Sequence, residues 1–262
     1  MKAKTPKITT DPKGGVLFVK NATIEGPGLF QEILVARSIP YGIVDLEAGQ
    51  PLPAVKGLKA VVVLGGPASA NHTTPTILAE LDFISQLLAA GVPYLGICLG
   101  MQLLVKAAGG QVNIHAIRET GVIAPDRHPF TMALTAQGRE DELFANINDS
   151  FPPLKAGATS VLPVFQLHGE TVQLPTDPAY PSRLLATGLF CTNQAVRVGE
   201  KAWGIQGHTE VTSSLLKDWM HTDPNLKDRD RIGMLRDLEH LGSEYRKAAE
   251  LIFGNFLTIA GL

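Results

Sequence analysis

The segment at residues 60–67 reads AVVVLGGP and indicates the class of fold. Its first five residues are apolar without a break and include three β-branched valines, as in a strand that is buried on both faces. The two glycines and the proline that follow end the strand. Such a strand is typical of a parallel sheet that helices cover on both sides.

Similar apolar runs alternate with helical patterns before and after this segment. We predict further strands over 15–19, 42–46 and 92–97, and helices over 28–38, 76–90 and 100–108. The sequence therefore predicts an α/β fold with an open, mostly parallel (mixed) sheet and helices on both faces.

The rest of the chain has weaker patterns. Residues 111–206 predict short strands between Pro- and Gly-rich turns, which add mixed or antiparallel strands to the sheet. Helices are predicted over 213–221 and 229–259, the second with a break at Gly242. Because no repeat or linker divides the chain, we predict a single domain over 1–262, with a core of about 15–211 and a helical extension of about 212–262.

Composition excludes several classes of function. The 23 basic and 25 acidic residues give a net charge of −2 without a basic block, which argues against nucleic acid or an anionic membrane as the partner. The basic N-terminus lacks the apolar stretch of a signal peptide, and no apolar run is long enough to span a membrane. Two cysteines cannot make a disulfide framework. We therefore expect a soluble, cytoplasmic protein.

The sequence GICLG at residues 96–100 lies between a predicted strand and a predicted helix. A nucleophile between two glycines at such a junction is typical of a nucleophile elbow, a sharp turn that leaves no room for neighbouring β-carbons. The start of the following helix directs N–H groups at Cys98 and favours its thiolate. Cys98 is thus a candidate nucleophile, although a small buried cysteine in an ordinary turn fits the five residues equally well.

A glycine-rich strand end lies at residues 65–67, GGP. Such an end can present backbone N–H groups to an oxyanion, and ligands of open α/β sheets gather at the carboxyl ends of strands. An ordinary turn is the alternative. A phosphate-binding loop is disfavoured, because no Gly-Lys-Ser/Thr follows.

A thiol nucleophile needs a base, and two histidines have a carboxylate two positions later. These are His168 with Glu170 and His208 with Glu210, and in an extended segment each pair shares a face. The residues alone leave this choice open. Zinc binding by histidines and cysteines lacks a metal-type spacing, so we expect no metal or cofactor and a structural role for Cys191.

Five segments together resemble the class I (Cys-His-Glu triad) glutamine amidotransferase family. They are GGP at 65–67, GICLGMQ at 96–102, VFQLHGE at 164–170, CTNQAVR at 191–197 and GIQGHTE at 204–210. The third and fourth of these segments are similar to those of stand-alone proteins that resemble the glutaminase domain of GMP synthase. The likeness covers about residues 16–211 and implies a flavodoxin-like fold.

The resemblance implies a catalytic role for five residues. Cys98 is the nucleophile, His208 is the general base and then acid, and Glu210 orients His208. The oxyanion hole is formed by the backbone N–H groups of Gly66 and Leu99.

The resemblance also implies a substrate pocket for glutamine. Gln102 and the backbone around His168 and Gly169 hold the amino acid end of the substrate, and Gly65 lines the pocket. His168 thereby belongs to substrate binding instead of the triad.

Two positions depart from the family's usual Gly-x-Gln-Phe-His-Pro-Glu. Gly207 replaces the phenylalanine and Thr209 replaces the proline. We expect the first change to remove packing around the base and the second to free the backbone between base and acid.

Three functions follow from these observations. The first is a glutaminase that supplies ammonia to an acceptor, with a synthetase partner or an already activated acceptor because the sequence has no ATP-binding loop. The second is a hydrolase of γ-glutamyl peptides or amines, which uses the same chemistry at Cys98. The third is a non-catalytic regulatory subunit, which Gly207 favours.

Overall fold

The computed structural model describes residues 14–153, 158–223, 226 and 230–262. Its helices are α1 Gly28–Ala36, α2 Pro75–Ala90, α3 Leu99–Ala107, α4 Ala136–Glu140, the 3₁₀ helix η1 Glu142–Phe144, α5 Ile147–Ser150, α6 Ser213–Thr222, α7 Arg231–His240 and α8 Gly242–Ile259. Its strands are β1 Val16–Lys20, β2 Tyr41–Asp45, β3 Ala60–Val63, β4 Tyr94–Ile97, β5 Gln111–Gly121, β6 Thr131–Leu134, β7 Val161–Pro163, β8 Gln166–Gln173, β9 Ser182–Thr187, β10 Ala195–Val198 and β11 Ala202–Ile205.

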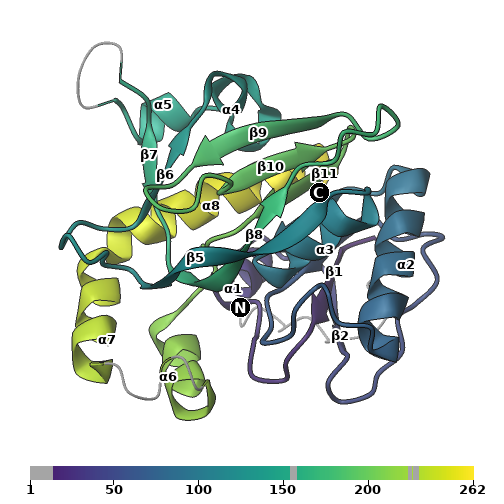
Figure 1. Cartoon of the computed structure of the whole chain (residues 1–262), viewed down its shortest axis with the longest axis horizontal. Helices are drawn as coiled ribbons and strands as arrows, with labels where there is room; N and C mark the ends of the chain where they lie inside the picture. Colours follow the sequence, from purple (N-terminus) through teal and green to yellow (C-terminus); the bar gives the residue numbers. More distant parts are fainter. Residues whose placement is uncertain (1–13, 154–157, 224–225, 227–229) are drawn as a thin grey trace.

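A nine-stranded sheet runs through the molecule in the order β2-β1-β3-β4-β11-β10-β9-β6-β7 (Figure 1). The first five strands in this order are parallel, and the remaining neighbours pair antiparallel. β5 and β8 form a separate antiparallel pair. The predicted α/β fold with a mixed sheet is confirmed, although β5 and β8 do not extend that sheet as we predicted for residues 111–206.

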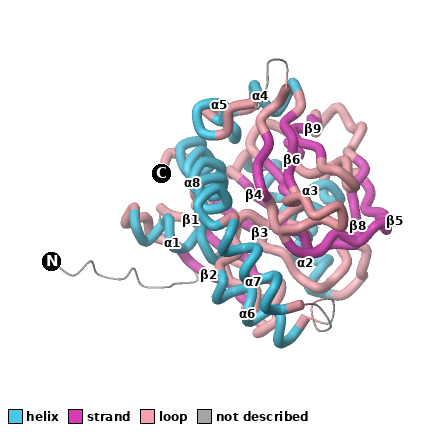
Figure 2. The backbone as a smooth tube through the Cα atoms, turned by 90° about the vertical axis from the view of Figure 1, so that its left-hand side faces the viewer, coloured by secondary structure: helices cyan, strands magenta, loops and turns pink. Residues whose placement is uncertain are grey.

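Helices cover the sheet on both faces (Figure 2). Successive residues of β1 point to opposite sides, so that Phe18 joins one apolar cluster and Leu17 joins the other. The first cluster includes α1 and α8, where the rings of Phe30 and Phe253 stack with centroids 4.4 Å apart. The second includes α2 and α3. Burial on both faces explains the uninterrupted apolar runs in the parallel strands.

Several element ends differ from the predicted ones for local reasons. The first helix stops at Ala36 instead of 38, because Ser38 has a left-handed φ of 56°. α2 begins at Pro75, where the Thr74 side chain accepts the Ile77 N–H. The predicted helix over 229–259 is divided into α7 and α8, with the second starting at Gly242, and position 229 lies outside the described residues.

Across the described part of the chain, every helix is too short or too polar to cross a lipid bilayer.

Candidate active site

Cys98 lies at a sharp turn between β4 and α3. Its backbone has φ 51° and ψ −105°, a region that residues with a β-carbon rarely adopt. A Cβ on Gly96 would lie 2.4 Å from the backbone of Gly100, and a Cβ on Gly100 would lie 2.2 Å from the Val63 carbonyl oxygen. Both flanking glycines are therefore required by close backbone contacts, and the turn holds Cys98 at the carboxyl end of the sheet.

Two polar groups contact the buried Cys98 thiol. Sγ lies 3.8 Å from the Leu167 carbonyl oxygen, and the Gln206 side-chain amide donates to Sγ at 3.6 Å. The Gln206 Oε1 in turn accepts from Gln102 Nε2 at 3.3 Å. Gln102 is therefore linked to the thiol by hydrogen bonds through Gln206. Gln206 belongs to the GIQGHTE motif, and our sequence analysis assigned it no role.

His208 and Glu210 form a buried pair beside this turn. His208 Nδ1 lies 2.6 Å from Glu210 Oε1, and the Thr209 N–H donates to Glu210 Oε2 at 2.9 Å. Burial disfavours the imidazolium, but Glu210 and Cys98 outweigh it and raise the pKa of His208 well above its ordinary value. An imidazole of this kind readily takes a proton from a neighbouring thiol.

The surroundings of His208 correct our expectation about the missing phenylalanine. The rings of Trp219 and Phe165 lie edge-on to His208, with centroids 5.1 Å and 6.3 Å away. A Cβ on Gly207 would lie 3.0 Å from Val164 Cβ, so a larger side chain there would displace its neighbour. Packing around the base is present and comes from other elements.

The missing proline also has a structural consequence. Thr209 donates its N–H to Glu210, and proline has no N–H to donate. The backbone between base and acid is therefore tied by a hydrogen bond instead of a ring, contrary to our expectation that it is freed.

Two residues of the C-terminal helices contact His208. Tyr245 of α8 donates its hydroxyl to the His208 carbonyl at 2.9 Å and accepts the Val211 N–H at 3.2 Å. Trp219 of α6 supplies the ring against His208. Our sequence analysis assigned neither residue a role, because both lie outside the motifs.

Gly66 and Leu99 lie together beside the thiol. A Cβ on Gly66 would be 3.2 Å from Leu99 Cδ2, and Leu99 is the first residue of α3. Within the described residues, neither N–H donates to another backbone or side-chain group. Gly66 lines the pocket and Leu99 does not, so the oxyanion hole formed by these two N–H groups stays a prediction.

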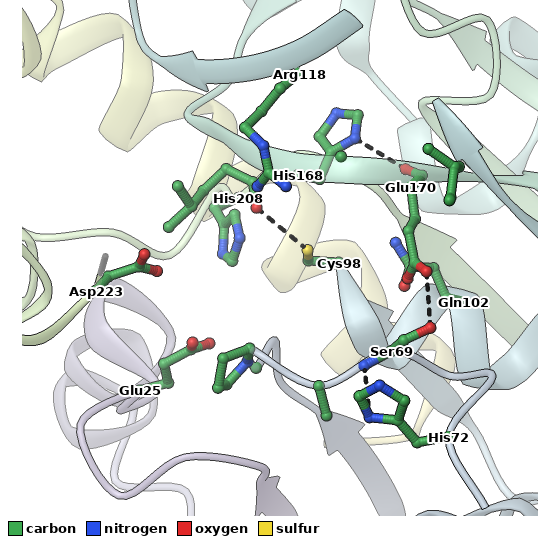
Figure 3. A pocket seen from close by; sticks show the side chains of 16 residues that line it. Glu25, Ser69, His72, Cys98, Gln102, Arg118, His168, Glu170, His208 and Asp223 are labelled. Carbon is green, nitrogen blue, oxygen red and sulfur yellow. Dashed lines mark hydrogen bonds between the residues drawn. The ribbon is translucent and has the colours of Figure 1, made fainter. Parts of the chain in front are cut away.

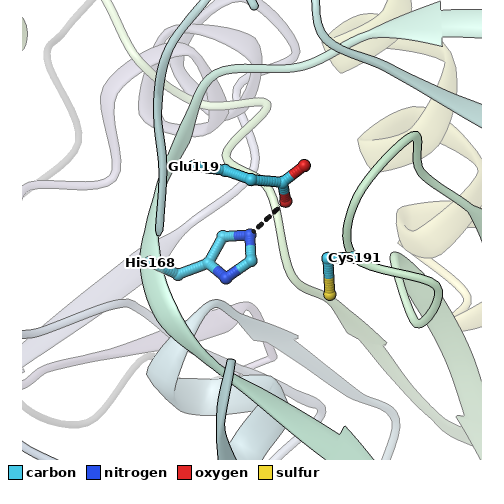
Figure 4. A group of neighbouring side chains, drawn as sticks. All are labelled: Glu119, His168 and Cys191. Carbon is cyan, nitrogen blue, oxygen red and sulfur yellow. Dashed lines mark hydrogen bonds and ion pairs between the residues drawn. The ribbon is translucent and has the colours of Figure 1, made fainter. Parts of the chain in front are cut away.

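The second candidate histidine has different partners (Figure 4). His168 Nε2 lies 2.7 Å from Glu119 Oε2, and Nδ1 contacts the Glu170 carbonyl oxygen at 3.0 Å. The Glu170 carboxylate accepts from Ser69 Oγ instead. Of the two histidine–carboxylate pairs, only His208 and Glu210 pair through their side chains.

Three buried groups around His168 have metal-ligating atoms. The ligand atoms of Glu119, His168 and Cys191 lie within 4.8 Å of one another. The Glu119–His168 contact at 2.7 Å is a hydrogen bond, and Cys191 Sγ lies 3.3 Å from Thr171 Oγ1. The spacing of these residues along the chain did not indicate this cluster.

A pocket of about 350 Å³ joins these groups (Figure 3). Its lining includes Gly66, Cys98, Gln102, His168, Gly169 and His208, all of them predicted site residues. Gly65 lies beside it, since a Cβ there would be 2.9 Å from His208 Cε1. Glu25 and Arg118 also line the pocket, and our sequence analysis missed both. Glu25 follows the carboxyl end of β1, a position that could have suggested it, whereas Arg118 had no signal.

Comparisons with known proteins show the family. Residues 34–223 match the family model described as glutamine amidotransferase class-I. The chain is 32% identical over 162 residues to the GMP synthase [glutamine-hydrolyzing] of Teredinibacter turnerae, which covers 60% of this chain and 26% of that protein. For the same enzyme of Edwardsiella ictaluri, the identity is 32% over 154 residues, 58% of this chain and 25% of that protein. The chain thus spans about a quarter of the length of these relatives.

Solved structures share the fold. A glutamine amidotransferase from Methylobacillus flagellatus superimposes with a TM-score of 0.77 at 24% identity, covering 94% of both chains. One from Thermotoga maritima gives a TM-score of 0.70 at 24% identity, covering 92% of this chain and 98% of that one.

Proposed function

Because the chain belongs to the class I glutamine amidotransferase family, we propose that it hydrolyses the side-chain amide of glutamine at Cys98 and supplies the ammonia to an acceptor. The observation that carries this proposal is the convergence of three separate segments on one pocket. β4–α3 brings Cys98, the segment after β11 brings the His208–Glu210 pair, and the loop after β3 brings Gly66.

In the first half-reaction, His208 takes the thiol proton and Cys98 attacks the amide carbon. The negative charge that develops on the amide oxygen is held by the N–H groups of Gly66 and Leu99. His208 then gives its proton to the nitrogen, the C–N bond breaks and ammonia leaves. A γ-glutamyl thioester remains on Cys98.

In the second half-reaction, His208 removes a proton from water and the hydroxide attacks the thioester. Glutamate leaves, and the proton returns to the sulfur. Glu210 stabilises the imidazolium in both halves, which its 2.6 Å contact with Nδ1 and the raised pKa of His208 support.

Arg118 lines the same pocket, and its guanidinium lies 2.8 Å from where a Gly169 Cβ would be. Arg118 binds the α-carboxylate, since a guanidinium matches a carboxylate geometrically. Gln102 and the backbone at His168 and Gly169 complete the contacts.

The acceptor is activated by a synthetase or arrives already activated. The relatives are named as GMP synthases and are about four times as long as the part of them that this chain matches. A synthetase that activates the acceptor is therefore the partner activity that these names suggest.

The nucleophile is tested by intact-protein mass spectrometry after exposure to a diazoketone analogue of glutamine. We expect one adduct on wild-type protein, mapped to Cys98, and none on Cys98→Ser. Cys191→Ser is the matched control and keeps the adduct, because Cys191 is not part of the pocket lining. Absence of labelling in all three proteins contradicts the proposal and favours the non-catalytic function.

A γ-glutamyl amine is the second candidate substrate. Two carboxyl groups, Glu25 and Asp223, line the His208 side of the pocket, where the leaving group departs (Figure 3). A higher kcat/KM for γ-glutamyl diamines than for glutamine favours the hydrolase.

A further inference from the structure

The mechanism above leaves one buried pocket carboxyl without a task. Glu25 is 8% exposed, in the loop between β1 and α1. Burial raises the pKa of its carboxyl to about 7, with Glu210, Asp223 and Glu47 adding to the effect and His208 opposing it. Within the described residues, no side chain or backbone group donates a hydrogen bond to it. Glu25 lines the pocket, so its carboxyl is open to a donor from a molecule bound there.

The loop that carries Glu25 is fixed against the proposed triad. The Leu29 N–H donates to the Glu210 carbonyl oxygen at 2.8 Å, and a Cβ on Gly28 would lie 2.0 Å from the same oxygen. Glu25 has no structural duty as a cap, because α1 begins after Pro27 without a side-chain capping bond. The carboxyl is therefore held in place by its backbone while its oxygens stay unbonded.

The geometry around Gly65 shows where the carboxyl points. A Cβ on Gly65 would lie 2.7 Å from Glu25 Oε2, 2.9 Å from His208 Cε1 and 3.6 Å from Cys98 Cβ. Cε1 lies between the two ring nitrogens, and Glu210 contacts only Nδ1. The Glu25 carboxyl thus faces the Cε1 edge of the His208 ring across Gly65, near Cys98.

We propose that Glu25 accepts a hydrogen bond from the leaving nitrogen of the substrate. This inference rests on the proposed function. As the C–N bond breaks, its electron pair goes to nitrogen, His208 Nε2 supplies the proton, and the N–H groups become more strongly polarised. A buried carboxyl in a fixed position binds this nitrogen more tightly in the transition state than in the bound substrate. Glu25 therefore favours substrates whose leaving atom carries hydrogen: an amide or a γ-glutamyl amine.

The test compares two substrates that form the same thioester on Cys98. Glutamine releases ammonia, whereas the γ-methyl ester of glutamate releases methanol. The leaving atom of the ester is an oxygen, which carries no N–H. For Glu25→Met, which keeps the length but has no acceptor oxygen, we expect kcat/KM for glutamine to fall about 100-fold, and for Glu25→Gln about 10-fold. For the ester, both variants stay within about threefold of wild type.

Glu47→Gln is the matched control. It removes a negative charge that acts on Glu25, while the glutamine oxygen can still accept the Thr23 N–H of the loop that carries Glu25. Glu47 is not among the pocket-lining residues. We expect its amide-to-ester ratio to equal that of wild type.

Equal losses on amide and ester overturn the inference, since a structural role or a role in attack by water affects both substrates alike. If Glu25→Met does not fold, the ratio for Glu25→Gln alone decides. Wild-type protein that releases glutamate from neither substrate contradicts the proposed function itself. Wild-type turnover with an unchanged ratio in the variants contradicts only the role of Glu25.

Discussion

At the scale of single residues, individual backbone hydrogen bonds position the proposed catalytic groups. Thr209 is an example, because its N–H reaches Glu210 Oε2 while its own buried Oγ1 has no hydrogen-bond partner in the described structure. Thr209 therefore positions Glu210 through its backbone N–H, and its hydroxyl makes no hydrogen bond that would help.

Replacing Thr209 with proline tests this interpretation. Thr209→Pro removes the donor to Glu210, and we expect kcat/KM for glutamine to fall about fivefold, since a hydrogen bond of this kind contributes about 1 kcal/mol. Thr209→Val is the control: it keeps the N–H and removes the unpaired hydroxyl, so activity is retained and the free energy of unfolding does not fall. Equal losses in the two variants rule out the backbone hydrogen bond as the cause.

At the scale of elements, helices outside the motifs support the site. α8 reaches it through Tyr245, whose hydroxyl bridges the His208 carbonyl and the Val211 N–H.

α2 carries a buried carboxyl. Glu80 is 1% exposed and has no hydrogen-bond partner for either carboxyl oxygen among the described residues.

The bridge from α8 predicts a measurable loss. Tyr245→Phe leaves the buried Val211 N–H without an acceptor, so we expect the free energy of unfolding to fall by about 1–3 kcal/mol. Activity falls as well, because the backbone of His208 loses a support. Tyr180→Phe, a half-buried tyrosine outside the site, is the comparison in urea denaturation and is expected to change stability little. A Tyr245→Phe protein as stable as wild type contradicts the bridge.

Glu80 predicts a dependence of stability on pH. Burial raises the pKa of Glu80 to about 8 from 4.5, and the nearby Asn21 side chain offsets only part of this rise. The folded state therefore holds the proton more tightly than the unfolded state. The contribution of Glu80 to stability is fully present below pH 4.5 and is lost as the pH rises towards 8.

Glu80→Gln removes this titration. A tenfold difference in proton affinity between the folded and unfolded states corresponds to about 1.4 kcal/mol, so the variant is expected to be more stable than wild type by several kcal/mol at about pH 8.5 and nearly equal to it at about pH 5. Chemical denaturation at the two pH values gives the measurement. A difference that does not depend on pH assigns the effect to packing instead.

At the scale of the whole molecule, we propose that the described residues of the C-terminal extension, 212–223, 226 and 230–262, fold as one unit with the rest. The stacking of Phe253 on Phe30 and the burial of α8 place the extension in the same apolar cluster as β1. Removing it exposes one face of the sheet.

A chain that ends at residue 211 is therefore expected to be insoluble or to unfold without a cooperative transition. Circular dichroism during heating checks this, with the full chain alongside. A truncated protein that unfolds cooperatively contradicts the proposal, because it shows that the rest of the chain folds without the extension.

Local sequence predicted the parallel half of the sheet within a residue or two at most ends. The runs at 15–19, 60–64 and 92–97 are apolar on both faces because helices cover both faces, and that pattern needs no knowledge of distant contacts. The turn at Cys98 was equally local, since its two glycines fail to tolerate a Cβ for reasons of immediate backbone geometry. The short antiparallel strands and the separate pair of β5 and β8 were not predictable in this way, because these strands are short or mix buried with exposed residues and so lack an uninterrupted apolar run.

The sequence by itself determined the class of fold, the strained turn at Cys98 and the two histidine–carboxylate pairs, since each depends on neighbours within a few positions. The spacing of the residues left open which pair is joined, and the family resemblance implied His208 with Glu210. The tertiary structure supplies the contacts: Ser69 bonds the Glu170 carboxylate and Glu119 bonds the His168 ring, whereas His208 and Glu210 pair through their side chains. It alone brought Glu25 and Tyr245 to the base. Hydrogen bonds and burial join groups by distance in space, and the spacing of residues along a chain does not encode that distance.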